Sequence, residues 1–443
     1  MATKQPKLGL LDKVFVGLLL VIFGGIVLHA PLSVGFSALF PSAEMVIKSW
    51  KEILLIIAIP VGIAVLVRRK QTALLRQPLI LLIAAYSALH LVLLPLEWNG
   101  VLPAAAGLLI DLRYLVFFVL VYLAISMYPS LRRTFLKVFV AGVMVVVGFA
   151  LLQVTVLPND TLKYIGYGES SIMPYLTVDE NPDYVRISST LRGPNPLGAY
   201  AAIVLTLLFA FGMRGNYRQF KRPVFIVALL GVGSVVALWT SYSRSALVGA
   251  IVAIVLVLLL TVGRRLSKWA WVSVIVLVMA VGGGLIAARN TDFVSNVILH
   301  ENPTTGASIS SNEGHIDSLS DGVNRMVHQP LGGGIGSTGS ASLYSDQPLI
   351  IENQYLFIAH EVGWIGLGLF LYISYKIYRG LWQRRKDWLA LGVLASGVGL
   401  ALIGLLLPVW VDDTVAIIWW GLAAIALGGL YERPLNKTSK RTA

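Results

Sequence analysis

The sequence predicts an all-α membrane protein of about 12 transmembrane helices, with a large extracytoplasmic loop before helix 10. The first observation is composition: of 443 residues, 57% are hydrophobic and only 13% are charged, and the mean hydropathy is +0.78. A soluble chain of this length carries roughly a quarter of charged residues. The other two observations are a series of apolar runs and the alternation of charge between them.

Apolar runs follow one another along the whole chain, and a helix needs about 20 such residues to cross the hydrocarbon core. The runs lie at 14–34, 51–67, 78–96, 101–126, 135–157, 196–213, 223–240, 245–263, 269–288, 354–378, 389–409 and 414–431. Short connections favour antiparallel neighbours. We therefore interpret residues 1–443 as a single polytopic membrane domain.

The basic residues predict the orientation of these helices. If the N-terminus is cytoplasmic, the cytoplasmic segments hold 26 of the 35 Lys and Arg residues and three of the 22 Asp and Glu residues. Such a bias is the positive-inside signal, which predicts a bacterial inner-membrane protein with both termini in the cytoplasm. The net charge of +13 is then a topology signal, and no nucleic-acid partner is needed to explain it.

Cysteine is absent, which excludes disulfides, thiolate metal sites and a cysteine nucleophile. The basic N-terminal stretch has no small-residue cleavage site, so we expect it to lead into the first helix. No motif calls for a cofactor, and a metal is not expected.

Two extracytoplasmic segments are long, at 158–192 and 289–352. Loops of this length are often functional. The second one is expected to be partly helical around 315–328, because Ile316, Leu319, Val323 and Met326 recur at helical spacing.

Four arginines on the predicted outer side run against the positive-inside trend: Arg186, Arg192, Arg244 and Arg325. A guanidinium group binds two oxygens of a phosphate at once, so a lipid headgroup or a lipid diphosphate is the natural ligand. Ser243 beside Arg244 can cap the next helix or offer its hydroxyl. The alternative for any single arginine is snorkelling or a structural ion pair.

Candidate bases lie in and after the second loop. Glu352 stands at the outer mouth of the helix expected from residue 354, where it is either a general base or compensation for the helix dipole. His315 and His328 are two further candidates for a base, although a histidine in a polar loop is more often incidental. Glu361 lies deeper, where a structural hydrogen bond is favoured over catalysis.

Three further features have two readings each. The glycine-rich stretch 330–339 is either an anion-binding nest or a flexible turn. Asp111 and Arg113 lie inside a predicted helix, where pairing with neighbouring helices is favoured. Asp179, Glu180 and Asp183 are acidic enough for a divalent cation but lack clear ligand spacing.

Four motifs on the predicted outer side occur in one order. They are Arg-Gly-Pro-Asn-Pro-Leu-Gly-Ala-Tyr at 192–200, Ser-Arg-Ser-Ala at 243–246, Pro-Leu-Gly-Gly-Gly-Ile-Gly at 330–336, and Glu-Asn-Gln-Tyr-Leu with Glu-Val-Gly-Trp-Ile-Gly at 352–366. In this order they resemble the O-antigen ligase and O-antigen polymerase superfamily. The motifs cover roughly residues 190–375, and the topology is similar over the whole chain.

The resemblance implies a GT-C-like membrane glycosyltransferase, inverting and metal-independent, acting on the outer face. It implies a polyprenyl (undecaprenyl) diphosphate-linked glycan as donor, and a glycan or the lipid A–core as acceptor. By resemblance, Arg192 and Arg244 hold the diphosphate and Glu352 acts on the acceptor hydroxyl. The residues expected to assist in substrate binding are Arg186, Arg325, Asn195, Ser243, Asn353, His328 and His315.

One departure from the ligase pattern matters. Ligases typically have His-Asn where this chain has Glu352 and Asn353, and Glu-Asn looks more like the polymerases. We therefore favour a polymerase slightly over a ligase. The alternative function is a transporter or flippase of lipid-linked saccharides, which would need polar groups at the membrane midplane and matching halves. A noncatalytic scaffold would leave the outer arginines unexplained.

Overall fold

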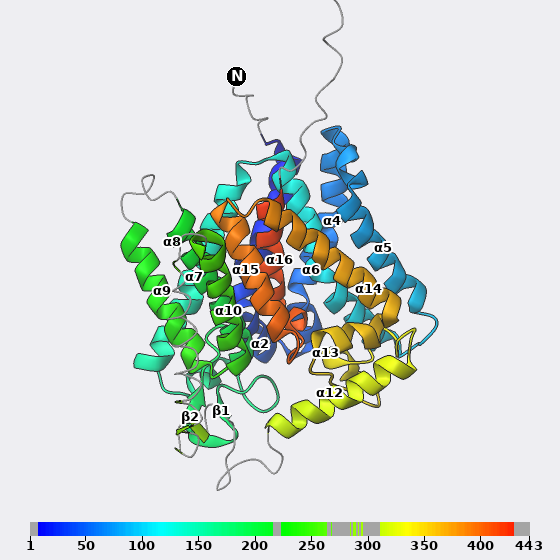
Figure 1. Ribbon diagram of the computed structural model, residues 1–443. Coiled ribbons are helices and arrows are strands. Elements are labelled where there is room, and N and C mark those ends of the chain that lie inside the picture. The colour runs from blue at the N-terminus through cyan, green and yellow to red at the C-terminus, as the bar shows by residue number, and fades with distance from the viewer. Residues whose placement is uncertain are drawn as a thin grey trace, which may run out of the picture.

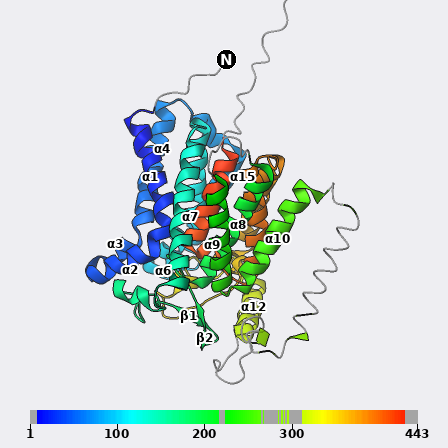
Figure 2. The ribbon, with the colours of Figure 1, turned by 90° about the vertical axis from the view of Figure 1, so that its left-hand side faces the viewer.

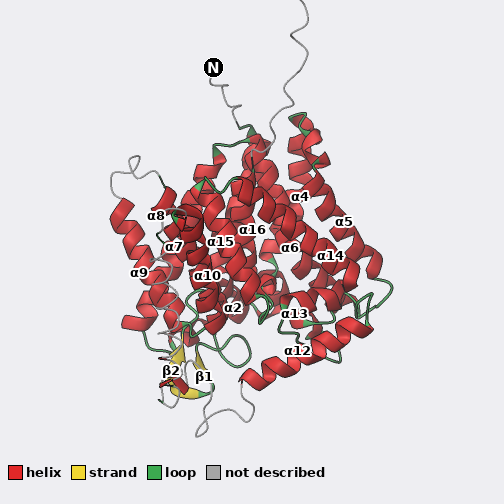
Figure 3. Cartoon of the chain, in the orientation of Figure 1, coloured by secondary structure: helices red, strands yellow, loops and turns green. Residues whose placement is uncertain are grey.

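The computed structural model is a bundle of helices that carries one small β-hairpin (Figures 1 and 3). It describes residues 8–215, 223–263 and 311–428, with a few single residues between 264 and 310. The longer helices run over these bounds: α1 Leu10–Gly25, α2 His29–Leu39, α4 Trp50–Arg68, α5 Pro78–Leu93, α6 Val101–Met127, α7 Leu131–Thr155, α8 Pro194–Arg214, α9 Pro223–Thr240, α10 Arg244–Thr261, α12 Ser311–His328, α14 Gln354–Gln383, α15 Trp388–Ile403 and α16 Asp413–Leu427.

The predicted all-α membrane fold is confirmed. Among the described residues, seven helices are long and apolar enough to cross a membrane, with α1 and α2 forming one such span at Leu10–Leu39. Four shorter apolar helices join them, in α5, α9, α15 and α16. Eleven of the apolar runs thus correspond to helices, and the run at 269–288 falls almost entirely outside the described residues.

Helix α16 forms the centre of the bundle, in red in Figure 1. Every residue from Thr414 to Leu427 is buried, as expected of a helix that is apolar all round. Trp419 and Trp420 pack on each other at 5.4 Å between ring centroids, and Trp420 packs on Tyr114 of α6 at 5.0 Å. This aromatic core fixes α6 and α16 as the scaffold for the surrounding helices.

A buried network of charges joins α4, α6 and α16. Arg113 of α6 pairs with Glu52 of α4 at 3.3 Å and also with Asp413 of α16. Lys51 reaches Asp413 at 3.0 Å, and His29 contacts the same carboxylate at 2.9 Å. The expected pairing of Arg113 with neighbouring helices is thus confirmed. Asp111 likewise faces a neighbour, lying 3.6 Å from His90 of α5.

One end of the bundle carries the structured loops, and we call it the loop end (Figures 1 and 2). It holds α12, the short helix α13 (Gly339–Ser342) and the hairpin of β1 (Leu176–Val178) and β2 (Asn181–Arg186). The strands pair antiparallel, with Leu176 opposite Arg186. At the other end, the basic end, Arg132 pairs with Asp387 at 2.7 Å. Polar groups that could meet a substrate therefore gather at the loop end.

Candidate functional site

The hairpin brings Arg186 against two other elements at the loop end. Its Nε donates to the carbonyl of Ser241, 3.0 Å away in the turn before α10. Its Nη2 donates to Oδ1 of Asn195, 2.7 Å away in the first turn of α8. Residues 186, 195 and 241–244, which are far apart in the sequence, therefore meet in one place. We call this group, with Asp179 and Arg244, the arginine cluster.

A close approach between α8 and the turn before α10 supports the cluster. A Cβ built on Gly198 would lie 2.8 Å from both Ala246 Cβ and Ser241 Oγ, so only glycine fits there. Ser243 occupies the N-cap position of α10, but its hydroxyl accepts no cap hydrogen bond and instead lies 3.4 Å from the Ser245 hydroxyl. The Ser243 side chain is buried and does not cap the helix.

Asp179 is the carboxylate of the arginine cluster. Burial lowers the pKa of Arg186 to about 10, an effect that Asp179 opposes and Arg244 reinforces. Burial also raises the pKa of Asp179 above its ordinary value, against the pull of Arg244 and Arg186. Asp179 thus faces two guanidinium groups, and the described residues contain no group of three His, Cys, Asp or Glu side chains placed to hold a metal ion. Two cations sharing one carboxylate leave a positive charge suited to an anion.

Arg192 lies apart from this group, on the path into α8. It is exposed, and its Nη1 is 3.4 Å from the hydroxyl of Ser340 in α13. Asp412, which caps α16, interacts electrostatically with both Arg192 and Arg113. Arg192 therefore stands between the loop that follows α12 and the buried charge network.

Glu352 and His315 face each other across α12 and the start of α14. His315 Nδ1 lies 2.6 Å from Glu352 Oε2, and both side chains are partly exposed. The backbone N–H of Glu352 donates to Ser318 Oγ at 2.9 Å, which ties the residue to α12. A carboxylate held beside an imidazole and open to solvent is a suitable acceptor for a proton.

Asn353 follows as the N-cap of α14. Its Oδ1 accepts the backbone N–H groups of Tyr355 and Leu356 at 2.9 and 3.0 Å, and its Nδ2 donates to the carbonyl of Leu405 at 2.8 Å. The side chain is buried. The geometry assigns Asn353 a part in orienting the start of α14, and its predicted contact with substrate stays a prediction.

The glycine-rich stretch does form a nest, and a carboxylate of the protein fills it. Glu361 accepts the backbone N–H groups of Gly336 and of Thr338, the latter at 3.0 Å. Positive φ angles at Gly332, Gly334 and Gly336 shape this loop. The expected structural hydrogen bond of Glu361 is thus confirmed, and the loop is packed against α14 and not free to turn.

The glycine-rich loop packs against a kink in α14. Val362 and Gly363 depart from helical geometry, with Gly363 at φ 65° and ψ −171°. The exposed backbone groups are satisfied by the loop, as Gly333 donates to the His360 carbonyl at 2.6 Å and Trp364 donates to the Pro330 carbonyl at 2.9 Å. Helix α14, the loop and α12 therefore form one connected unit.

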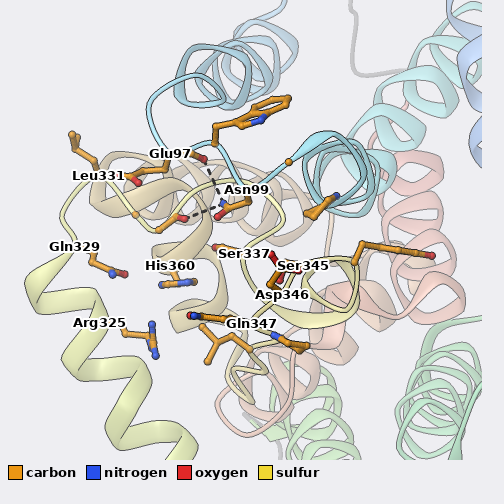
Figure 4. Close-up of a pocket in the computed structure, with 18 of the residues that line it drawn as sticks. Glu97, Asn99, Arg325, Gln329, Leu331, Ser337, Ser345, Asp346, Gln347 and His360 are labelled. Atoms are coloured by element: carbon orange, nitrogen blue, oxygen red, sulfur yellow. Dashed lines mark hydrogen bonds between the residues drawn. The ribbon is translucent and has the colours of Figure 1, made fainter.

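Arg325 and His328 lie at the far end of α12 and line a cavity of about 1060 Å³ (Figure 4). Arg325 Nε donates to Asp321 Oδ2 at 2.6 Å, one turn earlier in α12. The cavity wall does not include Glu352 or any member of the arginine cluster.

The ten predicted site residues are thus distributed over three places and one isolated position. Arg186, Asn195, Ser243 and Arg244 are in or beside the arginine cluster, Glu352, His315 and Asn353 are at the start of α14, Arg325 and His328 are at the cavity, and Arg192 is at α13. Sequence reasoning missed Asp179 as the counter-ion, and it missed Gln329 and Asn99 in the cavity wall. No motif marks these residues, because their partners are distant in sequence.

The fold and this loop end define a polytopic α-helical membrane protein that carries an arginine cluster and a carboxylate–imidazole pair at the same end of the bundle. Residues 226–371 match the O-antigen ligase family. An O-antigen polymerase of Salmonella muenchen is 24% identical over 268 residues, which are 59% of this chain and 64% of the relative. The similarity thus spans just under two thirds of that relative's length. By these two comparisons the chain is similar to proteins of the O-antigen ligase and O-antigen polymerase superfamily.

Proposed function

We propose that the protein is a membrane glycosyltransferase that moves a glycan from a polyprenyl-diphosphate carrier to an acceptor hydroxyl. The observation that carries this proposal is the 2.6 Å contact between Glu352 and His315 at the same end of the bundle as the arginine cluster. The similarity to the O-antigen ligase family and to an O-antigen polymerase supports the same class of reaction.

In the proposed reaction, Glu352 accepts the proton of the acceptor hydroxyl as its oxygen attacks the anomeric carbon. The bond from that carbon to the diphosphate oxygen breaks, and the electron pair leaves with the diphosphate. Arg244, with Arg186 in the same cluster, stabilises the charge that develops on the leaving group, and Arg192 reaches that group from its exposed position near α13. Attack opposite the leaving group inverts the anomeric configuration. His315 orients Glu352 and shares the proton, and no metal ion takes part.

We place the loop end outside the cytoplasm and both termini inside it, in the bacterial inner membrane. The support is the distribution of Lys and Arg, 26 of 35 of which fall in the segments assigned to the cytoplasm. Lipid-linked glycan would then reach the loop end from the outer leaflet, where membrane lipids surround the helices.

Between the two transferase types, we favour a polymerase, which joins the glycan to another lipid-linked repeat. Glu352 stands where ligases typically have histidine, and the relative's own name is O-antigen polymerase. A ligase would instead use a separate acceptor such as the lipid A–core.

The test is a product assay with the full chain in detergent, supplied with a polyprenyl-diphosphate oligosaccharide and EDTA. A ladder of longer lipid-linked chains is expected, and Glu352→Gln should abolish it. Transfer that occurs only after a separate lipid or glycan acceptor is added would make the protein a ligase. If no transfer occurs and the protein instead moves the lipid-linked saccharide across a vesicle membrane, the proposed transferase function is wrong and the protein is a flippase.

A further inference from the structure

The cavity of about 1060 Å³ is formed by three segments around the loop end of α14 (Figure 4). These are the connection of α5 to α6, the end of α12 with the loop after it, and the stretch 344–349. His360 of α14 contributes to the wall. Cavities of several hundred Å³ and more hold small organic ligands, so this one has room for more than one sugar ring.

Two buried polar atoms in the cavity wall have no hydrogen-bond partner in the part of the chain that the structure describes. They are His360 Nδ1 and Gln329 Oε1. The His360 side chain is only 3% exposed, and Figure 4 shows it beside Gln329 in the cavity wall. A buried polar atom without a partner is unfavourable, because it has lost its hydrogen bonds to water and gained none in exchange. Both atoms lie just beneath the surface of the wall, so a ligand hydroxyl would pair with them once the side chains rotate toward the cavity.

The other polar groups of the wall suit a neutral ligand that both donates and accepts. Asn99, Gln347 and Ser345 offer amides and a hydroxyl, which do both. Glu97 and Asp346 add carboxylates, which would repel a diphosphate. Arg325 is already paired with Asp321. The cavity therefore differs from the arginine cluster, where cations outnumber the carboxylate.

Aromatic and apolar side chains surround the polar groups. Trp98 and Tyr344 line the cavity and are 60% and 55% exposed, so their rings can cover the apolar face of a pyranose. Val101 and Leu331 line it too and are more than half exposed, as is Ile365 nearby in α14. Several exposed apolar side chains close together are expected where the surface of a protein contacts lipid. A glycan bound here would have its lipid alongside α5, α6 and α14.

We propose that this cavity binds the saccharide of a lipid-linked glycan, as the acceptor subsite of the enzyme; the assignment as acceptor rests on the proposed transferase function. Leu349 lines the cavity and lies three residues before Glu352, so at most about 11 Å of chain separates them. An oligosaccharide held in the cavity can therefore present a hydroxyl toward Glu352, while the donor diphosphate occupies the arginine cluster.

The experiment uses the full chain in nanodiscs and a probe with neither lipid nor diphosphate. The probe is the oligosaccharide released by mild acid from the lipid-linked glycan of the producing strain, and binding is followed by saturation-transfer NMR. Wild-type protein should bind it. Gln329→Leu should weaken binding about tenfold through the loss of one hydrogen bond. Trp98→Ala, at a largely exposed position, should weaken it without affecting folding.

Matched controls separate this site from the catalytic groups. Asn324→Leu removes an exposed amide from α12, five residues before Gln329 and outside the cavity lining, and should leave the affinity unchanged. Arg244→Ala should also bind the probe normally. Failure of the wild type to bind, or loss of binding in Arg244→Ala but not in Gln329→Leu, would overturn the inference. Normal probe binding by a protein that transfers no glycan would contradict the proposed function alone.

Discussion

Glu352 Oε2 lies 2.6 Å from His315 Nδ1, although 37 positions separate the two residues in the sequence. The contact depends on α12 lying across the start of α14, which the hydrogen bond from the Glu352 N–H to Ser318 maintains. The carboxylate keeps a solvent-exposed side because neither side chain is fully buried. In the proposed reaction, this arrangement would let Glu352 take a proton from the acceptor while His315 limits its orientation.

We expect Glu352→Gln to lower kcat by about 10²–10⁴-fold, because the amide keeps the shape of the side chain but cannot accept the proton. The KM for the donor should stay within about twofold. His315→Ala should lower kcat less, since it removes the partner and leaves the base. Single-turnover transfer of a labelled glycan measures these effects.

The control for this prediction is Glu169→Gln, which removes an exposed carboxylate from the 158–192 loop. It should keep wild-type kcat. Equal losses in Glu169→Gln and Glu352→Gln would point to a general effect of charge at the loop end and would remove Glu352 from its role.

Arg244→Ala should reduce kcat/KM for the donor by about 10²–10³-fold, the usual cost of losing one group that stabilises developing charge. Arg244→Lys should recover part of the loss, since lysine restores the charge but not the two-point contact with phosphate. The matched control is Arg133→Ala, which removes an exposed arginine near the basic end of α7. Its kcat/KM for the donor should equal that of the wild type. An Arg244→Ala enzyme with wild-type kinetics would contradict the proposal.

The helices could be predicted from the sequence because lipid is a simple solvent: long apolar runs satisfy their backbone only as helices there. The β1–β2 hairpin was not predicted. Its two-residue turn puts Asp179 and Glu180 at φ 45° and 61°, a conformation usually marked by Asn-Gly. Because this turn lacks glycine, the sequence shows no hairpin pattern there. Residues 158–192 could therefore be predicted only as a loop.

The residue types of the candidate site were predictable, but their grouping was not. Arg186 finds a partner at Asn195, only nine positions away, and another at Ser241, which is 55 positions away. From the sequence, the glycine-rich stretch could equally be an anion nest or a turn. The residues around it do not reveal that the Glu361 carboxylate fills the nest. Pairings of this kind depend on how helices pack, and one sequence does not encode them in any local pattern.

A pH dependence follows from Asp179, whose pKa is raised by burial. Because the pKa is raised, this carboxyl takes up a proton at a higher pH than an ordinary aspartate does. Protonation removes a negative charge beside Arg186 and Arg244, so donor binding should tighten as the pH falls toward that pKa. The KM for the donor, measured from pH 7.5 to 5, should decrease in the wild type.

Asp179→Asn provides the comparison for the pH effect. Its donor KM should be low at every pH in this range, because the amide never carries the opposing charge. A diphosphate esterified at both ends keeps its own charge here, so the substrate adds no titration of its own. The same slope in wild type and variant would show that another group is responsible.

The last prediction concerns the kink of α14, where Gly363 has a backbone conformation that is essentially restricted to glycine. A Cβ there would lie 2.4 Å from the carbonyl oxygen of Pro330, so Gly363→Ala should cost about 1–3 kcal/mol and lower the Tm in detergent. Gly368→Ala in the same helix meets open space and should keep or raise the Tm, since alanine favours helix by about 1 kcal/mol. Equal Tm values for the two variants would show that the glycine-rich loop does not depend on this kink.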